Sequence, residues 1–118
     1  MVRSSLLRAT FWLACIVVAA LSMTPTEYLT LGIFTWWDKA QHALTFFVLG
    51  GLGLIAYRNY WWWVVVGLLV FGGAIELAQD ASGWRNGEWA DWLADAVGLV
   101  SSVSVLALLR SRSDAAWK

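Results

Sequence analysis

The chain has 118 residues, of which 60% are hydrophobic and 14% are charged, and its mean hydropathy is +0.64. Soluble domains contain about 45–50% apolar residues, so the composition excludes an ordinary soluble domain and indicates an integral membrane protein. The formal net charge is zero, which provides no basic surface for nucleic acid. The single cysteine excludes an intrachain disulfide. The length suits one transmembrane domain, residues 1–118.

The first apolar segment runs from about residue 6 to 23 and ends before Pro25, which stops a helix. Basic residues before it and Ala20-Leu21-Ser22 within it are also features of a cleavable signal peptide. We expect the segment to be retained as a membrane span. The next segment, 26–37, is too short to cross a bilayer, and its end at Trp36 and Trp37 predicts that it lies in the membrane interface.

Three further apolar segments are long enough to cross a bilayer as helices. They run from about 39 to 57, from 60 to 79 and from 89 to 109. Arg58-Asn59 separates the first two, and a polar loop, 80–88, separates the last two. The sequence therefore predicts an all-α integral membrane four-helix bundle with short loops.

The positions of the basic residues predict the orientation of these spans. In a four-span arrangement six of the eight lie on one side: Arg3, Arg8, Arg58, Arg110, Arg112 and Lys118. Basic residues concentrate in cytoplasmic loops, so we expect both termini to be cytoplasmic. Seven of the eight acidic residues lie at or near the opposite side, which places a candidate site at the outer face.

The candidate site is built from polar residues at the outer ends of three spans. A charge in hydrocarbon costs roughly 2.5–3.5 kcal/mol, so such residues usually mark a site. Each span contributes residues three or four positions apart, which share one helix face. The candidates are Asp38, Lys39 and His42, then Glu76 and Gln79, then Asp91 and Asp95, with Arg85 in the loop between. We expect them to form a charged pocket lined below by Phe46, Gly50, Gly73 and Gly98.

Several of these residues have a simpler interpretation. Asp38 and Asp91 fit the first turn of a helix, where the macrodipole favours a carboxylate by about 0.3–1 kcal/mol. For Glu88, a place in the first turn of a helix, and for Asp80, a place in a solvated loop, are the favoured explanations. His42, Glu76 and Asp95 lie a turn inside apolar segments and favour a site. Most of the ten tryptophans fall at span ends and indicate interfacial anchors: Trp36, Trp37, Trp61, Trp62, Trp63, Trp84, Trp89 and Trp92.

Three motifs in order along the chain resemble the VanZ-like family of small bacterial membrane proteins. They are Asp38-Lys39-x-x-His42-x-x-x-Phe46, then Glu76-x-x-Gln79, then Arg85 followed by Asp91 and Gly98. The resemblance covers residues 38–98 and implies a multi-pass protein of the bacterial inner (cytoplasmic) membrane. The family is named for a member associated with low-level resistance to the antibiotic teicoplanin. One position differs from the family pattern: Asp95 occupies a position where the family usually has asparagine.

Two functions follow as expectations. The first is the binding or processing of an anionic lipid or a lipid-linked cell-envelope headgroup in the outer leaflet. His42, Asp38, Glu76 and Asp91 would be catalytic, with His42 as general acid and base, and Lys39, Gln79, Arg85 and Asp95 would bind substrate. The second is a non-catalytic membrane module whose charges form a structural ion-pair network or bind a lipid or a partner protein.

The sequence leaves open whether the chain is an enzyme and whether it uses a cofactor. One histidine with several carboxylates suits a divalent metal such as Mg²⁺, Mn²⁺ or Ca²⁺, and a histidine with two carboxylates could hold a catalytic zinc. The identity of the headgroup and the oligomeric state also stay open.

Overall fold

The computed structural model describes residues 2–25, 38–83 and 88–116. All regular structure within these ranges is helical: α1 (Val2–Met23), α2 (Asp38–Ala56), the short 3₁₀ helix η3 (Arg58–Tyr60), α3 (Trp61–Ser82) and α4 (Trp89–Ala116). The prediction of an all-α protein built on four long helices is therefore confirmed. The expected interfacial segment 26–37 with Trp36 and Trp37 lies outside the described residues, as does the loop 84–87 with Trp84 and Arg85.

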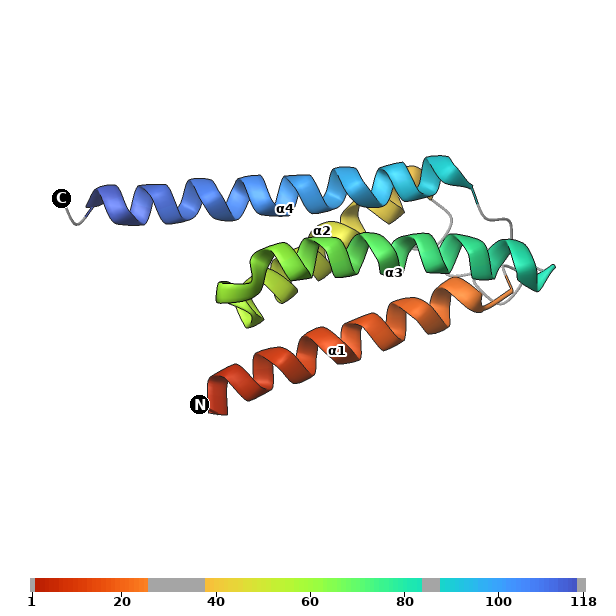
Figure 1. Cartoon of the computed structure of the whole chain (residues 1–118), viewed down its shortest axis with the longest axis horizontal. Coiled ribbons are helices and arrows are strands. Elements are labelled where there is room, and N and C mark those ends of the chain that lie inside the picture. Colours follow the sequence, from red (N-terminus) through yellow and green to blue (C-terminus); the bar gives the residue numbers. More distant parts are fainter. Residues whose placement is uncertain (1, 26–37, 84–87, 117–118) are drawn as a thin grey trace.

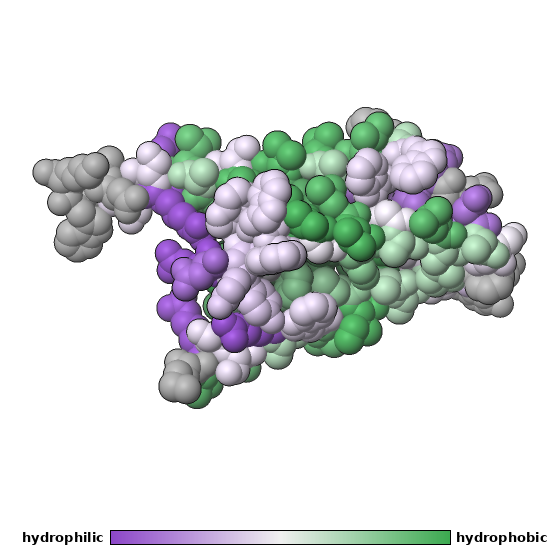
Figure 2. Space-filling view, viewed as in Figure 1, coloured by the Kyte–Doolittle hydropathy of each residue, from purple (hydrophilic) through white to green (hydrophobic). Residues whose placement is uncertain are grey.

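All four long helices are apolar and long enough to cross a membrane. Many of their large hydrophobic side chains face outward, among them Val48, Val70, Leu77, Val97 and Leu108. In Figure 2 hydrophobic side chains occupy the middle of the bundle, whereas hydrophilic ones gather toward its two ends. A soluble protein rarely exposes such a continuous apolar surface. The chain is a multi-pass membrane protein.

The helices run up and down, so that the ends of different helices meet at each end of the bundle (Figure 1). The first residues of α1, the turn at η3 and the last residues of α4 lie at one end. The end of α1, the start of α2, the end of α3 and the start of α4 lie at the other. We call this second end the site end, because it carries the polar residues described below. With 28 residues, α4 is the longest helix and extends past the others.

The tightest packing joins α2 to α4, the pair with the most extensive contact. Gly98 makes it possible, because a Cβ there would collide with the backbone carbonyl oxygen of Ala43 and the backbone nitrogen of Phe47. One turn further along α4, the Ser102 hydroxyl donates a hydrogen bond of 2.5 Å to the Phe47 carbonyl oxygen. Small residues allow transmembrane helices to approach closely, and interhelical hydrogen bonds then add to the packing.

Two helix ends differ from the predicted ones. α3 continues through the first residues of the expected loop and ends at Ser82, where Gly83 adopts a left-handed φ of 80°. Glycine takes this conformation without strain and commonly ends helices. Polar residues after Gln79 end the apolar segment but do not interrupt helical hydrogen bonding. α4 likewise continues to Ala116, past the predicted boundary at 109.

Trp92 differs from an interfacial anchor. Its side chain is only partly exposed, and its indole nitrogen donates a hydrogen bond of 2.9 Å to the Leu69 carbonyl oxygen on α3. The indole packs over Gly73, where an added Cβ would be in ordinary contact with the Trp92 Nε1 atom at 3.5 Å. Trp92 therefore fastens α4 to α3, whereas Trp61, Trp62 and Trp63 are exposed at the start of α3.

Candidate functional site

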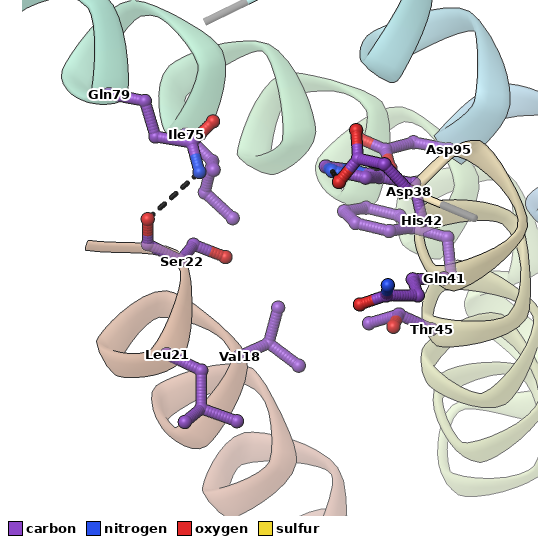
Figure 3. A pocket seen from close by; sticks show the side chains of 11 residues that line it. Val18, Leu21, Ser22, Asp38, Gln41, His42, Thr45, Ile75, Gln79 and Asp95 are labelled. Carbon is purple, nitrogen blue, oxygen red and sulfur yellow. Dashed lines mark hydrogen bonds and ion pairs between the residues drawn. The ribbon is translucent and has the colours of Figure 1, made fainter. Parts of the chain in front are cut away.

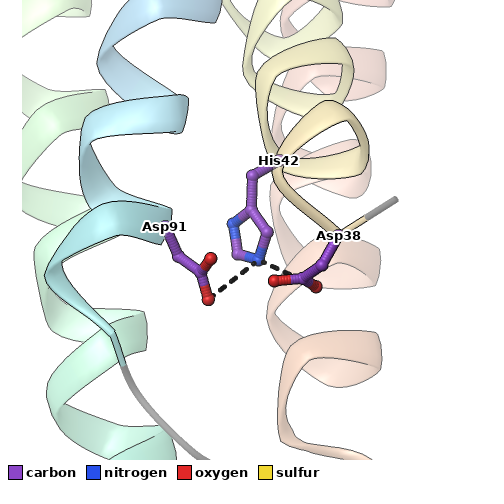
Figure 4. Close-up of side chains that lie close together, drawn as sticks. All are labelled: Asp38, His42 and Asp91. Carbon is purple, nitrogen blue, oxygen red and sulfur yellow. Dashed lines mark ion pairs between the residues drawn. The ribbon is translucent and has the colours of Figure 1, made fainter. Parts of the chain in front are cut away.

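The polar residues of three helices meet around His42, the only histidine of the chain. Its Nε2 atom lies 3.8 Å from Asp38 Oδ1 and 3.6 Å from Asp91 Oδ2, so that the ring stands between two carboxylates (Figure 4). Its Nδ1 atom lies 3.0 Å from Asp95 Oδ1 and 3.9 Å from Glu76 Oε1. Only the contact to Asp95 has hydrogen-bond length. Each ring nitrogen therefore faces two carboxylate groups.

Two glycines make room for this cluster inside the bundle. Gly98 brings α2 and α4 together one turn beyond Asp95, on the same stripe of α4. Gly72 on α3 lies opposite Asp95, and a Cβ there would lie 2.7 Å from the Asp95 Oδ2 atom. As a result Asp95 is only 1% exposed and Asp91 only 4%. Charged groups so well buried need partners close by.

Lys39 supplies positive charge at the outer edge of the cluster. Its Nζ atom lies 2.5 Å from Asp91 Oδ1, 2.7 Å from Glu88 Oε2 and 3.5 Å from Asp38 Oδ2. The lysine is thus occupied by residues of the protein itself. Five acidic side chains surround one lysine and one histidine: Asp38, Glu76, Glu88, Asp91 and Asp95. Among the described residues, the cluster therefore carries an excess of negative charge.

Glu76 and Gln79 come from the last turns of α3 and are almost fully buried, at 5% and 1% exposure. Glu76 Oε2 accepts a hydrogen bond of 2.9 Å from the backbone N–H of Glu88, which ties the start of α4 to α3. Gln79 donates one of 2.8 Å to the Ser22 carbonyl oxygen, which ties the end of α1 to α3 (Figure 3). The second oxygen of Glu76 and the amide oxygen of Gln79 have no hydrogen-bond partner among the described residues.

A cavity of about 130 Å³ opens beside His42, between α1 and the ends of α2 and α3. Figure 3 shows its two walls. One, from α1 and α3, carries Val18, Leu21 and Ile75 together with the hydrogen-bonded Ser22 and Gln79. The other carries His42 and Asp95 with further polar side chains. Its full lining is Val18, Leu21, Ser22, Asp38, Gln41, His42, Thr45, Phe46, Ile75, Gln79 and Asp95.

A larger cavity, of about 280 Å³, lies between α1 and α3 on the other side of the molecule's core. It is lined almost entirely by apolar and aromatic residues, including Phe11, Trp12 and Tyr57. The Trp12 indole donates a hydrogen bond of 2.8 Å to the Tyr57 hydroxyl at its edge. This cavity offers space for an acyl chain but has no group suited to acid–base or metal chemistry. In the described residues, such groups cluster around His42.

The structure brings most of the predicted site residues together. Asp38, Lys39, His42, Glu76, Asp91 and Asp95 lie in one cluster, and Gln79 lies nearby on the wall of the cavity. Arg85 lies outside the described residues. Of the expected lower lining, Phe46 borders the cavity, whereas Gly50, Gly73 and Gly98 act at helix contacts, opposite Ser102, Trp92 and Ala43.

Glu88 is the residue that the simpler interpretation of the sequence undervalued. It binds Lys39 through its side chain and Glu76 through its backbone N–H. Its spacing of three residues before Asp91, on the same helix face, was the available signal. The contribution of α1 through the Ser22 carbonyl had no such signal, because a backbone oxygen cannot be read from residue identity.

Two sets of three side chains in the described residues have the geometry to hold a metal ion. One comprises Asp38, His42 and Asp91, and the other His42, Glu76 and Asp95; within each set the ligand atoms lie within 4.8 Å of one another. The hydrogen bond between His42 and Asp95 also offers a path for a proton between the imidazole and a carboxylate.

Comparison with known proteins identifies no relative: no family model, no curated protein and no solved structure matches the chain. The VanZ-like resemblance thus remains a prediction from the three motifs. The function has to be argued from the geometry of the site.

Proposed function

We propose that this chain binds the polar headgroup of a membrane lipid, or of a lipid-linked cell-envelope precursor, in the cavity beside His42. The observation that carries the proposal is the two-sided lining of that cavity. Apolar side chains of α1 face the ionisable wall that carries His42 and Asp95 across the same space. This is the pattern that the junction of a lipid headgroup with its acyl chains requires, since one end of such a ligand is polar and the other is not.

The size of the cavity limits which part of a ligand enters it. At about 30 Å³ for each water molecule in the liquid, a volume of 130 Å³ corresponds to roughly four waters. A phosphate, an amine or a glycerol unit fits this space. We therefore assign the linkage region of the headgroup to the cavity and the remainder to the membrane surface.

The site belongs, in this proposal, to the outer face of the bacterial inner membrane. Arg3, Arg8, Arg58, Arg110 and Arg112 all belong to the end of the bundle opposite the site. Cytoplasmic segments are the ones enriched in such residues. With both termini in the cytoplasm, the site end meets the outer leaflet, where cell-envelope precursors are exposed.

The VanZ-like resemblance forms part of the same proposal. Eight of the nine residues in its motifs fall in the described residues, and all eight lie in the half of the bundle at the site end: Asp38, Lys39, His42, Phe46, Glu76, Gln79, Asp91 and Gly98. Six of them carry the polar groups of the cluster, and Gly98 permits the helix contact beneath it. Their proximity supports a common site. The proposed role in the cell envelope and its link to teicoplanin resistance come from the resemblance.

A purely structural network is the second candidate, and one observation favours it. Lys39 is fully engaged by Asp91, Glu88 and Asp38, as expected for charges that serve to fix the packing of helices. This interpretation explains the outer edge of the cluster. It gives no role to the cavity, and it leaves two buried oxygen atoms unpaired.

Filling the cavity separates the two candidates without disturbing any ion pair. Val18 lines the cavity from α1, whereas its neighbour Val17 is 47% exposed. The protein is purified in mild detergent, and its co-purifying lipids are quantified by mass spectrometry for the wild type, Val18→Phe and the matched control Val17→Phe. We expect one headgroup class to be enriched in the wild type and Val17→Phe and lost in Val18→Phe. Equal lipid profiles in all three proteins would exclude the cavity as a headgroup site.

A further inference from the structure

A buried carboxylate oxygen on the Nδ1 side of the His42 ring has no hydrogen-bond partner among the described residues. Glu76 is 5% exposed, and its Oε1 atom receives no hydrogen bond from any described residue, although Oε2 is bound by the Glu88 N–H. Leaving a charged group buried and unsatisfied is costly, and native structures rarely do so without a reason. A proton or a cation is the natural partner for this oxygen.

The atoms around this oxygen are those of a metal site. His42 Nδ1 lies 3.9 Å from Glu76 Oε1 and 3.0 Å from Asp95 Oδ1, and the three ligand atoms lie within 4.8 Å of one another. Metal–ligand bonds of about 2.1 Å place neighbouring ligands roughly 3.0–3.4 Å apart. The observed separations bracket this range. Small side-chain rotations would bring all three atoms onto one ion.

The charges around the site call for a cation at this position. Lys39 lies on the other side of the ring, where it binds Asp91 and Glu88. Glu76 and Asp95 therefore have no basic side chain other than His42 among the described residues. A divalent ion held by these two carboxylates would neutralise them both.

The opposite edge of the ring faces carboxylates, the groups that commonly support metal-binding histidines. Such a histidine commonly presents its second ring nitrogen to a carboxylate, which fixes the orientation of the ring. Here His42 Nε2 faces Asp91 at 3.6 Å and Asp38 at 3.8 Å (Figure 4). The Nε2 atom thus faces two carboxylates just beyond hydrogen-bond distance, while the Nδ1 atom points toward Glu76 and Asp95.

We propose that His42, Glu76 and Asp95 bind one divalent cation of the class that accepts imidazole together with carboxylates, Zn²⁺ or Mn²⁺. Three protein ligands leave coordination positions open. The cavity is lined by His42 and Asp95, so it provides access to these positions. An open position is the feature of a metal site that binds or activates a ligand, whereas structural sites are closed.

The cation would also remove a difficulty of the proposed function, and this part of the inference rests on it. An anionic headgroup is repelled by a cluster with five acidic side chains. A divalent ion on Glu76 and Asp95 would present positive charge to the cavity and could receive a phosphate oxygen. Metal binding itself does not depend on any lipid.

The test measures metal binding in detergent, first without added lipid. Protein stripped with a chelator is titrated with Zn²⁺ and with Mn²⁺ by isothermal titration calorimetry, and Co²⁺ is added separately to follow its visible ligand-field absorption. We expect one ion per chain for the wild type. Glu76→Gln keeps an oxygen for the Glu88 N–H but loses the charge, and we expect it to weaken binding at least about 10-fold. The Co²⁺ spectrum should change in both Glu76→Gln and Asp95→Asn.

Two matched variants control for charge alone. Asp80→Asn removes an exposed carboxylate from the same helix as Glu76, and Asp38→Asn removes a member of the other set of three. We expect Asp80→Asn to bind the ion with the affinity of the wild type, whereas Asp38→Asn, whose carboxylate faces the Nε2 edge of the ring, should weaken binding less than Glu76→Gln does. Equal affinity in Glu76→Gln and Asp80→Asn would show adventitious binding only and overturn the proposal. If Asp38→Asn lost metal binding while Glu76→Gln kept it, the assignment of the ion to His42, Glu76 and Asp95 would be overturned.

A second measurement separates failure of the metal site from failure of the proposed function. Binding of vesicles containing phosphatidylglycerol is compared with and without the preferred ion, for the wild type and Glu76→Gln. Metal binding without any lipid effect supports the site and contradicts the bridging role. Lipid binding that is the same in both proteins and independent of the ion contradicts the bridging role and leaves the headgroup proposal intact.

Discussion

Replacing Gly98 with alanine tests whether α2 and α4 approach each other as closely as the site requires. The added Cβ would collide with the backbone carbonyl oxygen of Ala43 and the backbone nitrogen of Phe47. Backbone atoms cannot rotate out of the way as a side chain can. The helices would have to separate by about 1 Å to restore ordinary contact distances.

The structure gives both the energetic and the local consequence of this separation. Overpacking costs about 1–3 kcal/mol, and a collision with backbone belongs at the upper end. Alanine recovers roughly 1 kcal/mol of helix propensity relative to glycine, so the expected net loss is about 2 kcal/mol. The hydrogen bond of 3.0 Å between His42 and Asp95 joins the same two helices one turn away. A separation of about 1 Å would lengthen it beyond the range of a hydrogen bond.

Thermal unfolding in detergent, followed by tryptophan fluorescence, measures the effect. Gly51→Ala is the matched control, since its Cβ would meet no atom within 4 Å. We expect the control to be as stable as the wild type or up to about 1 kcal/mol more stable. The two variants should differ by roughly 3 kcal/mol. If Gly98→Ala is as stable as Gly51→Ala, the close contact of α2 and α4 is wrong.

Three further predictions concern single contacts. Lys39→Met should destabilise the protein by about 1–3 kcal/mol in chemical unfolding, because it leaves Asp91 without its cation. Adding Asp91→Asn to this variant should restore most of the lost stability. If it does not, the two residues are not coupled. Ser102→Ala should lower the free energy of unfolding by about 0.5–1.5 kcal/mol. Ser101→Ala should lower it less, because the Ser101 hydroxyl bonds within its own helix. Equal losses would contradict the interhelical bond. Gln79→Leu should speed hydrogen–deuterium exchange at the end of α1, and unchanged exchange there would show that this bond does not hold the helix.

The sequence predicts the helices well, because length and hydropathy decide whether a segment can span a membrane. Their ends are predicted less well. The apolar segment that contains Glu76 ends near Gln79, but the helix ends only where Gly83 allows a left-handed turn. Hydropathy reports the depth of a residue in the membrane, whereas helix termination depends on backbone hydrogen bonding, and the two need not coincide.

The candidate site was predictable to the extent that helix periodicity determines it. Pairs such as Asp91 and Asp95 share one face because they lie one turn apart. Their convergence with His42 depends on which face of each helix turns inward, and this is determined by packing partners such as Gly98. Glu88 could not be separated from a solvated residue by its type, since its importance comes from where Lys39 and Glu76 lie.

The central claim is that carboxylates from different helices surround the ring of His42. Because the chain has one histidine, ¹⁵N labelling of histidine marks this ring alone. Solid-state NMR in lipid bilayers, with ¹³C at the aspartate carboxyl carbons, then measures the distances from the ring nitrogens. From the Nδ1–Oδ1 separation of 3.0 Å the account predicts strong dipolar coupling to a carboxyl carbon at about 3.5–4 Å, reduced in Asp95→Ala. The absence of any carboxyl carbon within about 6 Å, twice a hydrogen-bond distance, would contradict it.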